Sequence, residues 1–322
     1  MRLLIVTQKV DENDDVLGFM HGWIAEFAKH CTNVIVICLQ EGEHHLPENV
    51  KVLSLGKEKK HLRLHHLMRF YRYIWQERGN YDAVFVHMNP EYAILGGILW
   101  RLWHKKVLLW YTHKAVNWRL RLGALSATKI FTASKESFRL TSKKVEVVGH
   151  GIPVEAFADC PENAPTGRLC LLAVGRNSPS KDFVTAIKAV EELRNDKDLP
   201  VVEFKIESDS KYGEMPLIYR NCHIMIHTSR TGSMDKVVLE ALASGRIVAT
   251  SSEAYASLAN GELKGVMFHF SPGDYHELAK TIEEIYLSGI LKALPSQQGI
   301  SYVQQNHNLH TLISKIIAYF SG

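Results

Sequence analysis

A segment in the second half of the chain carries residues that could hold an anion. Gly175 and Arg176 follow a β-branched apolar run, and Lys181 comes five residues later, where a helical pattern begins. A turn from a strand into a helix directs backbone amides and the positive end of the helix dipole at one point. Two cations beside that point would neutralise a departing diphosphate. Ordinary solvent-exposed charges on a loop are the alternative, and the spacing alone does not choose between them.

A second segment, residues 227–245, combines a strand, a polar loop containing glycine, and a short helix that ends at another glycine. Ser233 and Asp235 are then expected at the carboxyl edge of a parallel sheet, where open α/β sheets bind ligands. Glu240 lies in the helix, and its carboxylate could accept both hydroxyls of a ribose. The alternatives are an N-terminal capping role for Asp235 and a surface ion pair with a lysine for Glu240.

The first half offers weaker candidates. His113 follows the apolar run 107–110 and could line a ligand cleft, although a histidine in that place is more often a packing residue. Gly18 follows an acidic loop and would let the backbone approach a bound group. The aspartates within residues 11–15 could contact a ligand, and a solvated acidic loop is their more common role.

The elements that must position these residues alternate along the chain. Short β-branched runs cover residues 3–6, 34–38, 84–86, 107–110, 130–132 and 145–148, and then 169–174, 201–206, 224–226 and 247–250. Helical patterns lie between them, and this alternation predicts parallel sheets. The loop 160–167, rich in Pro, Asn and Ala, separates the two series. We therefore expect two α/β domains, residues 1–160 and residues 161–301.

One predicted helix, in the segment 61–78, is amphipathic and basic, with histidines and arginines away from its apolar side. That side comprises Leu64, Leu67, Met68, Tyr71, Ile74 and Trp75. We expect the helix to dock on the first sheet with its charged face in solvent, and contact with a membrane surface is the alternative. Binding of single-stranded nucleic acid ranks lower, because no RNA-binding signature accompanies the segment.

Bulk composition excludes several classes of protein. The 322 residues are 46% hydrophobic, and no charge-free apolar run approaches the ~20 residues that span a bilayer. The five cysteines are scattered without CxxC spacing, which predicts neither a disulfide framework nor a zinc site. We expect a cytoplasmic protein. The net charge of +4 is uneven, because residues 1–155 hold 22 basic and 15 acidic residues. Such a surface suits anionic lipid, nucleic acid or a phosphorylated acceptor.

Four motifs, taken in order, resemble those of family-four retaining glycosyltransferases with the GT-B fold (glycosyl transferases group 1). They are Trp-Tyr-Thr-His at 110–113, Val-Gly-His-Gly-Ile-Pro at 148–153, the Gly-Arg…Lys segment at 175–181, and Leu-Glu-Ala at 239–241 with its glycine at 245. The resemblance covers nearly the whole chain. It implies two Rossmann-like parallel-sheet domains facing across a cleft, the first on the acceptor side and the second binding the nucleotide-sugar. It also implies that a C-terminal helix at about 302–320 packs back on the first domain.

The resemblance assigns roles to individual residues. Arg176 and Lys181 would hold the donor diphosphate, Glu240 would hold the ribose, and His113 would line the cleft near the transferred sugar. His113, Arg176 and Lys181 are thus the predicted catalytic residues. The predicted donor-binding residues are Gly18, Gly175, Gly232, Ser233, Met234, Asp235, Lys236 and Glu240. Neither a metal ion nor a cofactor beyond the nucleotide-sugar substrate is expected.

Two departures from the family pattern bear on the donor. Gly232 stands where the family has the first of two glutamates, and Asp235 or Lys236 could replace that carboxylate from the same loop. The strand 201–206 runs almost directly into residues 215–219, so the second domain is expected to be shorter by about one βα unit.

The sequence thus predicts a metal-independent retaining glycosyltransferase that uses a nucleotide diphosphate-sugar. Its basic and aromatic features favour a lipid-linked or polysaccharide acceptor and a peripheral position on the cytoplasmic face of an anionic membrane. Three alternatives stay open. They are a degenerate GT-B module that binds a nucleotide-sugar without turnover, a nucleotide-sugar 2-epimerase and, last, a nucleic-acid-binding protein.

Overall fold

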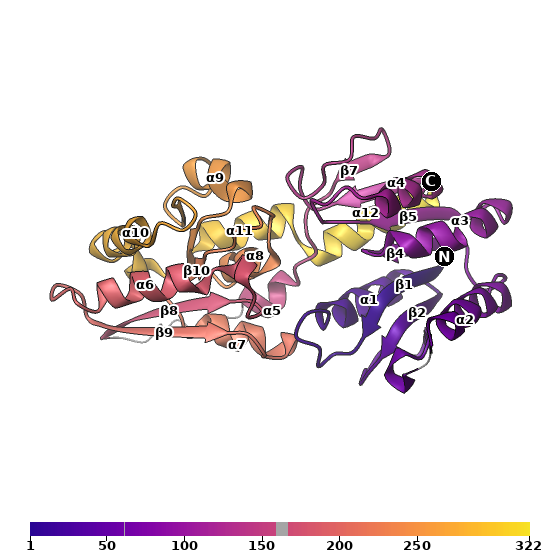
Figure 1. Ribbon diagram of the computed structural model, residues 1–322, viewed down its shortest axis with the longest axis horizontal. Helices are drawn as coiled ribbons and strands as arrows, with labels where there is room; N and C mark the ends of the chain where they lie inside the picture. Colours follow the sequence, from indigo (N-terminus) through magenta and orange to yellow (C-terminus); the bar gives the residue numbers. More distant parts are fainter. Residues whose placement is uncertain (61, 159–166) are drawn as a thin grey trace. The chain divides into compact units, whose positions relative to one another are not determined.

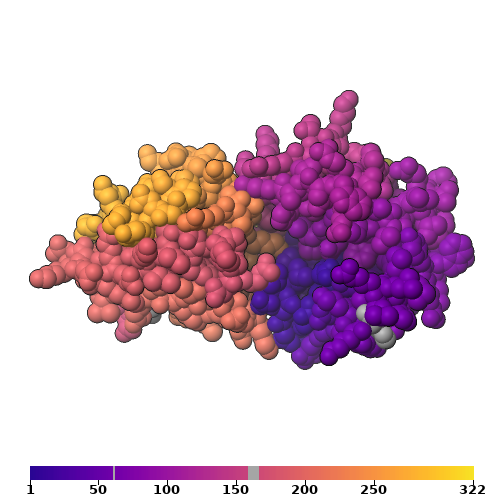
Figure 2. All heavy atoms as spheres, in the orientation of Figure 1, coloured from indigo at the N-terminus to yellow at the C-terminus, as the bar shows by residue number. Residues whose placement is uncertain are grey.

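The computed structural model describes residues 1–60, 62–158 and 167–322 of the chain, which form two compact units built from different parts of the sequence (Figures 1 and 2). The first unit comprises residues 1–151, 211–213 and 309–322, and the second comprises 152–210 and 214–308. The chain therefore enters the second unit after Gly151. Most of the loop that the sequence predicts as the domain boundary, residues 160–166, lies outside the described residues.

The first unit is built on a seven-stranded parallel sheet with the order β3-β2-β1-β4-β5-β6-β7. Its strands are β1 (Arg2–Val10), β2 (Asn33–Glu41), β3 (Val50–Ser54), β4 (Ala83–His87), β5 (Lys106–Trp110), β6 (Lys129–Thr132) and β7 (Val145–Val147). Its α-helices are α1 (Phe19–His30), α2 (Arg63–Gln76), α3 (Pro90–Leu102), α4 (Trp118–Ser126) and α12 (Leu309–Ser321). Six of these strands are the predicted ones, and β3 is additional.

The alternation of side chains along β1 explains why helices cover both faces of this sheet. Leu3 and Ile5 point into a core shared with α1 and α12, whereas Leu4 and Val6 point into a second core shared with α2, α3 and α4. Because a central strand of a parallel sheet is buried on both faces, it appears in the sequence as a continuous apolar run. The carboxyl ends of these strands all lie at one edge of the sheet.

The second unit has a five-stranded parallel sheet with the order β12-β11-β10-β8-β9. Its strands are β8 (Arg168–Val174), β9 (Val201–Glu207), β10 (Ile224–His227), β11 (Ile247–Thr250) and β12 (Met267–His269). Its α-helices are α5 (Val154–Ala158), α6 (Phe183–Leu193), α7 (Met215–Arg220), α8 (Lys236–Ala243), α9 (Glu253–Asn260), α10 (Tyr275–Leu287) and α11 (Gln297–Asn306). The two parallel-sheet units confirm the predicted fold class.

The C-terminal segment contains two helices where the sequence predicts one at about 302–320. The first, α11, belongs to the second unit, and α12 belongs to the first. Leu312, Ile313 and Ile316 of α12 are fully or almost fully buried in the core that α1 also lines. None of the helices in the described residues is both long and apolar enough to cross a bilayer.

The orientation of α2 corrects a prediction. The helix docks on the sheet through Phe70 and Ile74, and Phe70 packs against the rings of Tyr92 and Trp100. Four of the residues that the apolar side was predicted to bury are exposed instead: Leu64, Met68, Tyr71 and Trp75. The helix is apolar on more than one side, and the aromatic pocket on α3 selects the side that contains Phe70.

Candidate functional site

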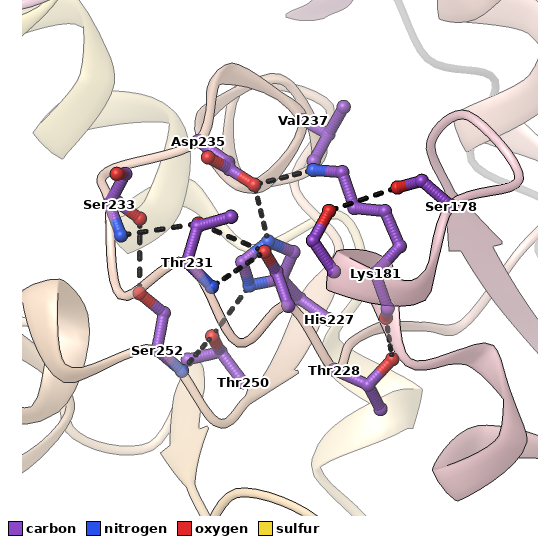
Figure 3. Close-up of polar contacts among 12 residues, drawn as sticks. Ser178, Lys181, His227, Thr228, Thr231, Ser233, Asp235, Val237, Thr250 and Ser252 are labelled. Carbon is purple, nitrogen blue, oxygen red and sulfur yellow. Dashed lines mark hydrogen bonds and ion pairs between the residues drawn. The ribbon is translucent and has the colours of Figure 1, made fainter. Parts of the chain in front are cut away.

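The two predicted ligand-binding segments meet at the carboxyl edge of the second sheet (Figure 3). Gly175 and Arg176 come directly after β8, and the loop 228–235 comes directly after β10. Helix α6 begins after the first segment and α8 after the second. Since β8 and β10 are neighbours in the sheet, two helix N-termini lie near one edge, and both favour an anion there.

The side chain of Lys181 joins the two segments. Its Nζ lies 2.6 Å from Oδ2 of Asp235, and both side chains are 19% exposed. The Thr228 hydroxyl donates a hydrogen bond of 2.7 Å to the backbone carbonyl of Lys181, which fixes the segment to the loop after β10. An ammonium group has three protons to donate, so the contact with Asp235 positions Lys181 and leaves capacity for a bound anion.

Asp235 is the centre of a buried polar network. The same Oδ2 lies 3.1 Å from Nε2 of His227, and Nδ1 of His227 lies 2.9 Å from Oγ1 of Thr250. Burial alone would raise the pKa of the Asp235 carboxyl, but His227 and Lys181 outweigh it and hold this pKa well below its usual range. Asp235 stands at the N-cap position of α8, yet its side chain makes no capping hydrogen bond. Its carboxylate is directed to Lys181 and His227 instead.

Two glycines give the site its close backbone geometry. Gly175 has φ of +145°, and a Cβ at this position would lie 3.1 Å from Cε of Lys181. Gly232 has φ of +60° and is buried. Residues other than glycine rarely adopt these φ values. The neighbouring Met234 is buried, and the carbonyl of Ser233 accepts a hydrogen bond of 3.0 Å from the Ser252 hydroxyl.

Glu240 is buried, with 3% exposure, so the alternative of a surface ion pair is wrong. Its Oε2 accepts a hydrogen bond of 3.2 Å from the Tyr219 hydroxyl. Lys236 precedes it by one helical turn, and its Nζ has almost no accessible surface. Burial lowers the pKa of Lys236, and the nearby Glu240 carboxylate opposes that shift. The buried ammonium therefore does not act as a surface group on the loop.

The remaining predicted residues lie in different settings. Arg176 is exposed and pairs with none of the described residues, so its guanidinium is available to a ligand. His113 is exposed in the first unit, and its Nδ1 accepts a hydrogen bond of 3.0 Å from the amide of Ala115. Gly18 is the N-cap residue of α1, and a Cβ there would lie 2.5 Å from the carbonyl oxygen of Asp14. The carboxylate of Asp14 pairs with Lys9 at 2.6 Å, which neutralises part of the acidic loop.

Sequence reasoning missed three residues of the second unit. His227 and Thr250 end the adjacent strands β10 and β11 in register with each other. Arg230 donates a hydrogen bond of 2.8 Å from Nε to Asp182, which has φ of +48° at the start of α6. A polar residue that ends an apolar strand is the signal that could have identified the first two, because strand ends of a parallel sheet lie at one edge.

The carboxyl edge of the first sheet holds a second polar cluster that the sequence did not indicate. His87 is buried at the end of β4, and its Nδ1 lies 3.4 Å from Oγ1 of Thr7. The rings of Phe19 and Trp23 contact it edge-on, with centroids 5.8 and 6.0 Å away. The next residue, Met88, has φ of +61°. Aromatic rings thus enclose this imidazole at the carboxyl edge of the first sheet.

Comparison with known proteins gives the following matches. Residues 147–288 match the family model "Glycosyl transferases group 1". No curated protein sequence matches the chain. Among solved structures, HepE from Anabaena in complex with UDP and glucose is 15% identical, with a TM-score of 0.74 over 100% of both chains. WaaG, a glycosyltransferase involved in lipopolysaccharide biosynthesis, is 13% identical, with a TM-score of 0.69 over 99% of this chain and 100% of WaaG.

The UDP-GlcNAc 2-epimerase from Methanocaldococcus jannaschii is also 13% identical, with a TM-score of 0.64 over 100% of both chains. At these identities the structural likeness concerns the fold, which epimerases and transferases share. The family match favours a transferase over an epimerase, because it covers the segments that form the Lys181 and Asp235 site. The chain therefore has the GT-B fold, and its residues 147–288 match a glycosyl transferases group 1 domain.

Proposed function

We propose that this protein transfers a sugar from a nucleotide diphosphate-sugar to an acceptor hydroxyl, with retention at the anomeric carbon and without a metal ion. The observation that carries the proposal is the ammonium of Lys181, held 2.6 Å from Asp235 where α6 and α8 begin. A helix N-terminus and a fixed cation together suit a diphosphate. The bound UDP and glucose in HepE, a protein of the same fold, support this class of donor.

In the proposed step, the bond between the anomeric carbon and the diphosphate oxygen breaks, and its electron pair leaves with the diphosphate. Lys181, Arg176 and the start of α8 stabilise the developing negative charge. The acceptor oxygen bonds to the anomeric carbon on the face that the diphosphate leaves, and the acceptor proton passes to a diphosphate oxygen. Asp235 positions Lys181 and takes no proton in this scheme, because His227 and Lys181 already stabilise its ionised form.

Roles for the other predicted residues belong to the same proposal. Glu240 would contact the ribose, the loop 232–236 would lie near the donor sugar, and His113 of the first unit would lie near the transferred group. The family has a glutamate where this chain has Gly232. Because Nζ of Lys236 is buried, Asp235 is the better candidate to replace that glutamate. The excess of basic residues in the first 155 residues supports a lipid-linked or polysaccharide acceptor and a cytoplasmic location at a membrane face.

The test measures release of free nucleoside diphosphate from a panel of UDP-, GDP- and ADP-sugars with a chelator present. We expect one donor class to be consumed by the wild type, and Lys181→Ala to reduce release at least about a hundredfold, as losses of a charge-stabilising group do. Lys280→Ala is the matched control, since its side chain is 75% exposed on α10 away from the site. The anomeric configuration of the product, read by NMR, tests retention.

The same panel separates the alternatives. Donor binding without release in the presence of acceptor mixtures would establish a module that no longer turns over, which the glycine at 232 motivates. Conversion of the donor into a different nucleotide-sugar, with no acceptor present, would establish an epimerase. Activity that disappears with the chelator and returns with a divalent cation would contradict the metal-independent step.

A further inference from the structure

Helices α2, α3 and α4 pack on the same core of the first unit. All three helices bury their inner residues in the same core, with Phe70, Trp100 and Leu120 as examples. The Tyr71 hydroxyl of α2 donates to the carbonyl of Leu95 on α3, and α3 and α4 approach closely where Gly97 meets Ser126. We call the outward surface of these three helices the docking face.

Large apolar side chains project from the docking face. Among them, Ile98 is 74% exposed, Leu102 and Leu125 are each 67% exposed, and Trp75 is 53% exposed. Others on the same helices are Leu64, Met68, Tyr71, Trp118 and Leu122. Scattered surface leucines are ordinary in proteins, whereas apolar groups gathered on three adjacent helices indicate a surface that is covered by something.

The charged residues of the docking face are almost all basic. Helices α2, α3 and α4 contain six arginines and a single acidic residue, Glu91, which pairs with one of them, Arg119, at 3.1 Å. The arginines are Arg63, Arg69, Arg72, Arg101, Arg119 and Arg121. Long basic side chains can lay their stems along apolar surface while the charged ends meet anionic groups. The partner is therefore apolar in part and negatively charged.

A basic cavity of about 470 Å³ opens beside the C-terminal ends of α3 and α4. The charged and titratable residues that line it are Arg101, His104, Lys105, Lys106 and Lys144, and no aspartate or glutamate is among the lining residues. The arginine and the three lysines donate to backbone carbonyls and not to carboxylates. For example, Lys144 Nζ lies 2.7 Å from the carbonyl of Ala127, and Arg101 lies 3.3 Å from that of Leu125. A cavity with this uncompensated charge favours an anion.

We propose that the docking face binds the surface of an anionic lipid bilayer, with its leucines and Trp75 in the interfacial layer and a lipid phosphate in the basic cavity. Apolar side chains and arginines on the same helices match the two layers of such a surface, acyl chains below and anionic headgroups above. A soluble acidic protein would complement the arginines but not the exposed leucines of the docking face. This interaction specifies, and rests on, the proposed location at a membrane face, and it uses none of the donor-site residues.

The first experiment sediments the full-length protein with vesicles of phosphatidylcholine alone, or with one third of the lipid replaced by phosphatidylglycerol. We expect binding to the anionic vesicles and release from them at ~1 M salt, where charges are screened within ~3 Å. Equal binding to both kinds of vesicle, or binding to neither, would overturn the proposal. So would displacement from anionic vesicles by millimolar glycerol phosphate, which would assign the cavity to a soluble phosphate.

Variants locate the interaction on the docking face. Leu102→Ser combined with Leu125→Ser is expected to lower the partition coefficient about tenfold through lost apolar insertion. Leu217→Ser combined with Leu287→Ser is the matched control, because these leucines are 59% and 63% exposed on the second unit. An equal loss in the control pair would contradict the location.

The charge contribution has its own pair of variants. Arg101→Gln and Arg121→Gln are each expected to lower binding to anionic vesicles about fivefold, whereas the control Lys280→Gln leaves it unchanged. If a single-stranded oligonucleotide binds more tightly than the vesicles and displaces them, the partner of the docking face is nucleic acid and not lipid. All these variants are expected to release nucleoside diphosphate at the wild-type rate without vesicles, so the failure of either proposal leaves the other testable.

Discussion

At the scale of single residues, the contact between Lys181 and Asp235 determines what the anion site can bind. The carboxylate holds the ammonium in place, and His227, whose other ring nitrogen contacts Thr250, holds the carboxylate. An unpaired lysine on a loop would be mobile, and its electrostatic stabilisation of a departing diphosphate would be weaker because the group must first be positioned. The network thus converts a surface lysine into a fixed positive charge.

Asp235→Asn tests this positioning role. The substitution keeps the size of the side chain and removes its charge, so we expect nucleoside diphosphate release to fall about tenfold or more and the free energy of unfolding to fall by about 2 kcal/mol. Enzyme assays and urea unfolding at neutral pH measure the two effects. Asp198→Asn, on an exposed turn of the same unit, is the control. Unchanged release in Asp235→Asn would show that Lys181 needs no carboxylate.

Lys236 gives the second unit a predictable dependence of stability on pH. Burial lowers its pKa in the folded protein below the ordinary value of 10.5. At pH values between the lowered pKa of the folded protein and the ordinary pKa of the unfolded chain, the unfolded chain binds more protons than the folded chain. The free energy of unfolding therefore rises with pH in this range. Lys236→Met removes this contribution and flattens the curve by up to ~1.4 kcal/mol per pH unit. Urea unfolding from neutral pH to about pH 10 measures this pH dependence, with Lys280→Met as the exposed control. If the free energy of unfolding of Lys236→Met rose with pH as steeply as that of the wild type, the burial of Lys236 would be contradicted.

At the scale of elements, two turns at strand ends position the site. The turn after β8 brings Gly175 against the stem of Lys181, and the loop after β10 brings Asp235 to the start of α8. The strands and helices that flank these turns follow from the sequence, because buried parallel strands are continuous apolar runs. The edge strands β3 and β12 do not follow from it, since the first is only half-buried and the second has three residues.

Gly175→Ala tests the first turn. The φ of +145° strains any side chain, and the added methyl group would meet Cε of Lys181 at 3.1 Å. We expect a loss of ~1–3 kcal/mol in stability together with a clear drop in nucleoside diphosphate release. Gly265→Ala is the matched control: its φ is +91°, and a methyl group added there would meet nothing within 4 Å. Gly265→Ala should lose stability and keep its activity. Equal activity in the two variants would show that the turn at Gly175 does not contribute to the reaction.

The sequence predicts the site residues that belong to local patterns. It does not predict those that depend on partners distant in the sequence. Gly175, Lys181 and Asp235 stand in local patterns that predict a strand, a turn and a helix. His227 ends an apolar strand, which could have marked it as a candidate, but its contacts with Thr250 and Asp235 depend on neighbours in space that no local pattern contains. The exposed side of α2 was missed for a similar reason, because the choice of buried face is made by Trp100 and Tyr92 on α3.

At the scale of the whole molecule, the last helix belongs to the unit that contains the first strand. Ile316 of α12 is fully buried in the core with α1. Ile316→Ala is expected to lower the free energy of unfolding of the first unit by ~2–5 kcal/mol. Ile282→Ala, at a fully buried position of α10, is the control in the second unit. Hydrogen exchange assigns each loss to a unit, and identical protection changes in both variants would show that the two units unfold together.

The position of α12 also affects the order in which the protein folds during synthesis. Residues 1–151 leave the ribosome first, but Trp23 and Phe27 face a core that stays incomplete until residues 309–321 have emerged. The second unit emerges in between and contains all of its own strands. It is therefore expected to fold before the first unit is finished, in contrast to the usual N-terminal-first order. During that interval the side of α1 that α12 later covers stays exposed, with Trp23 and Phe27 among its apolar residues.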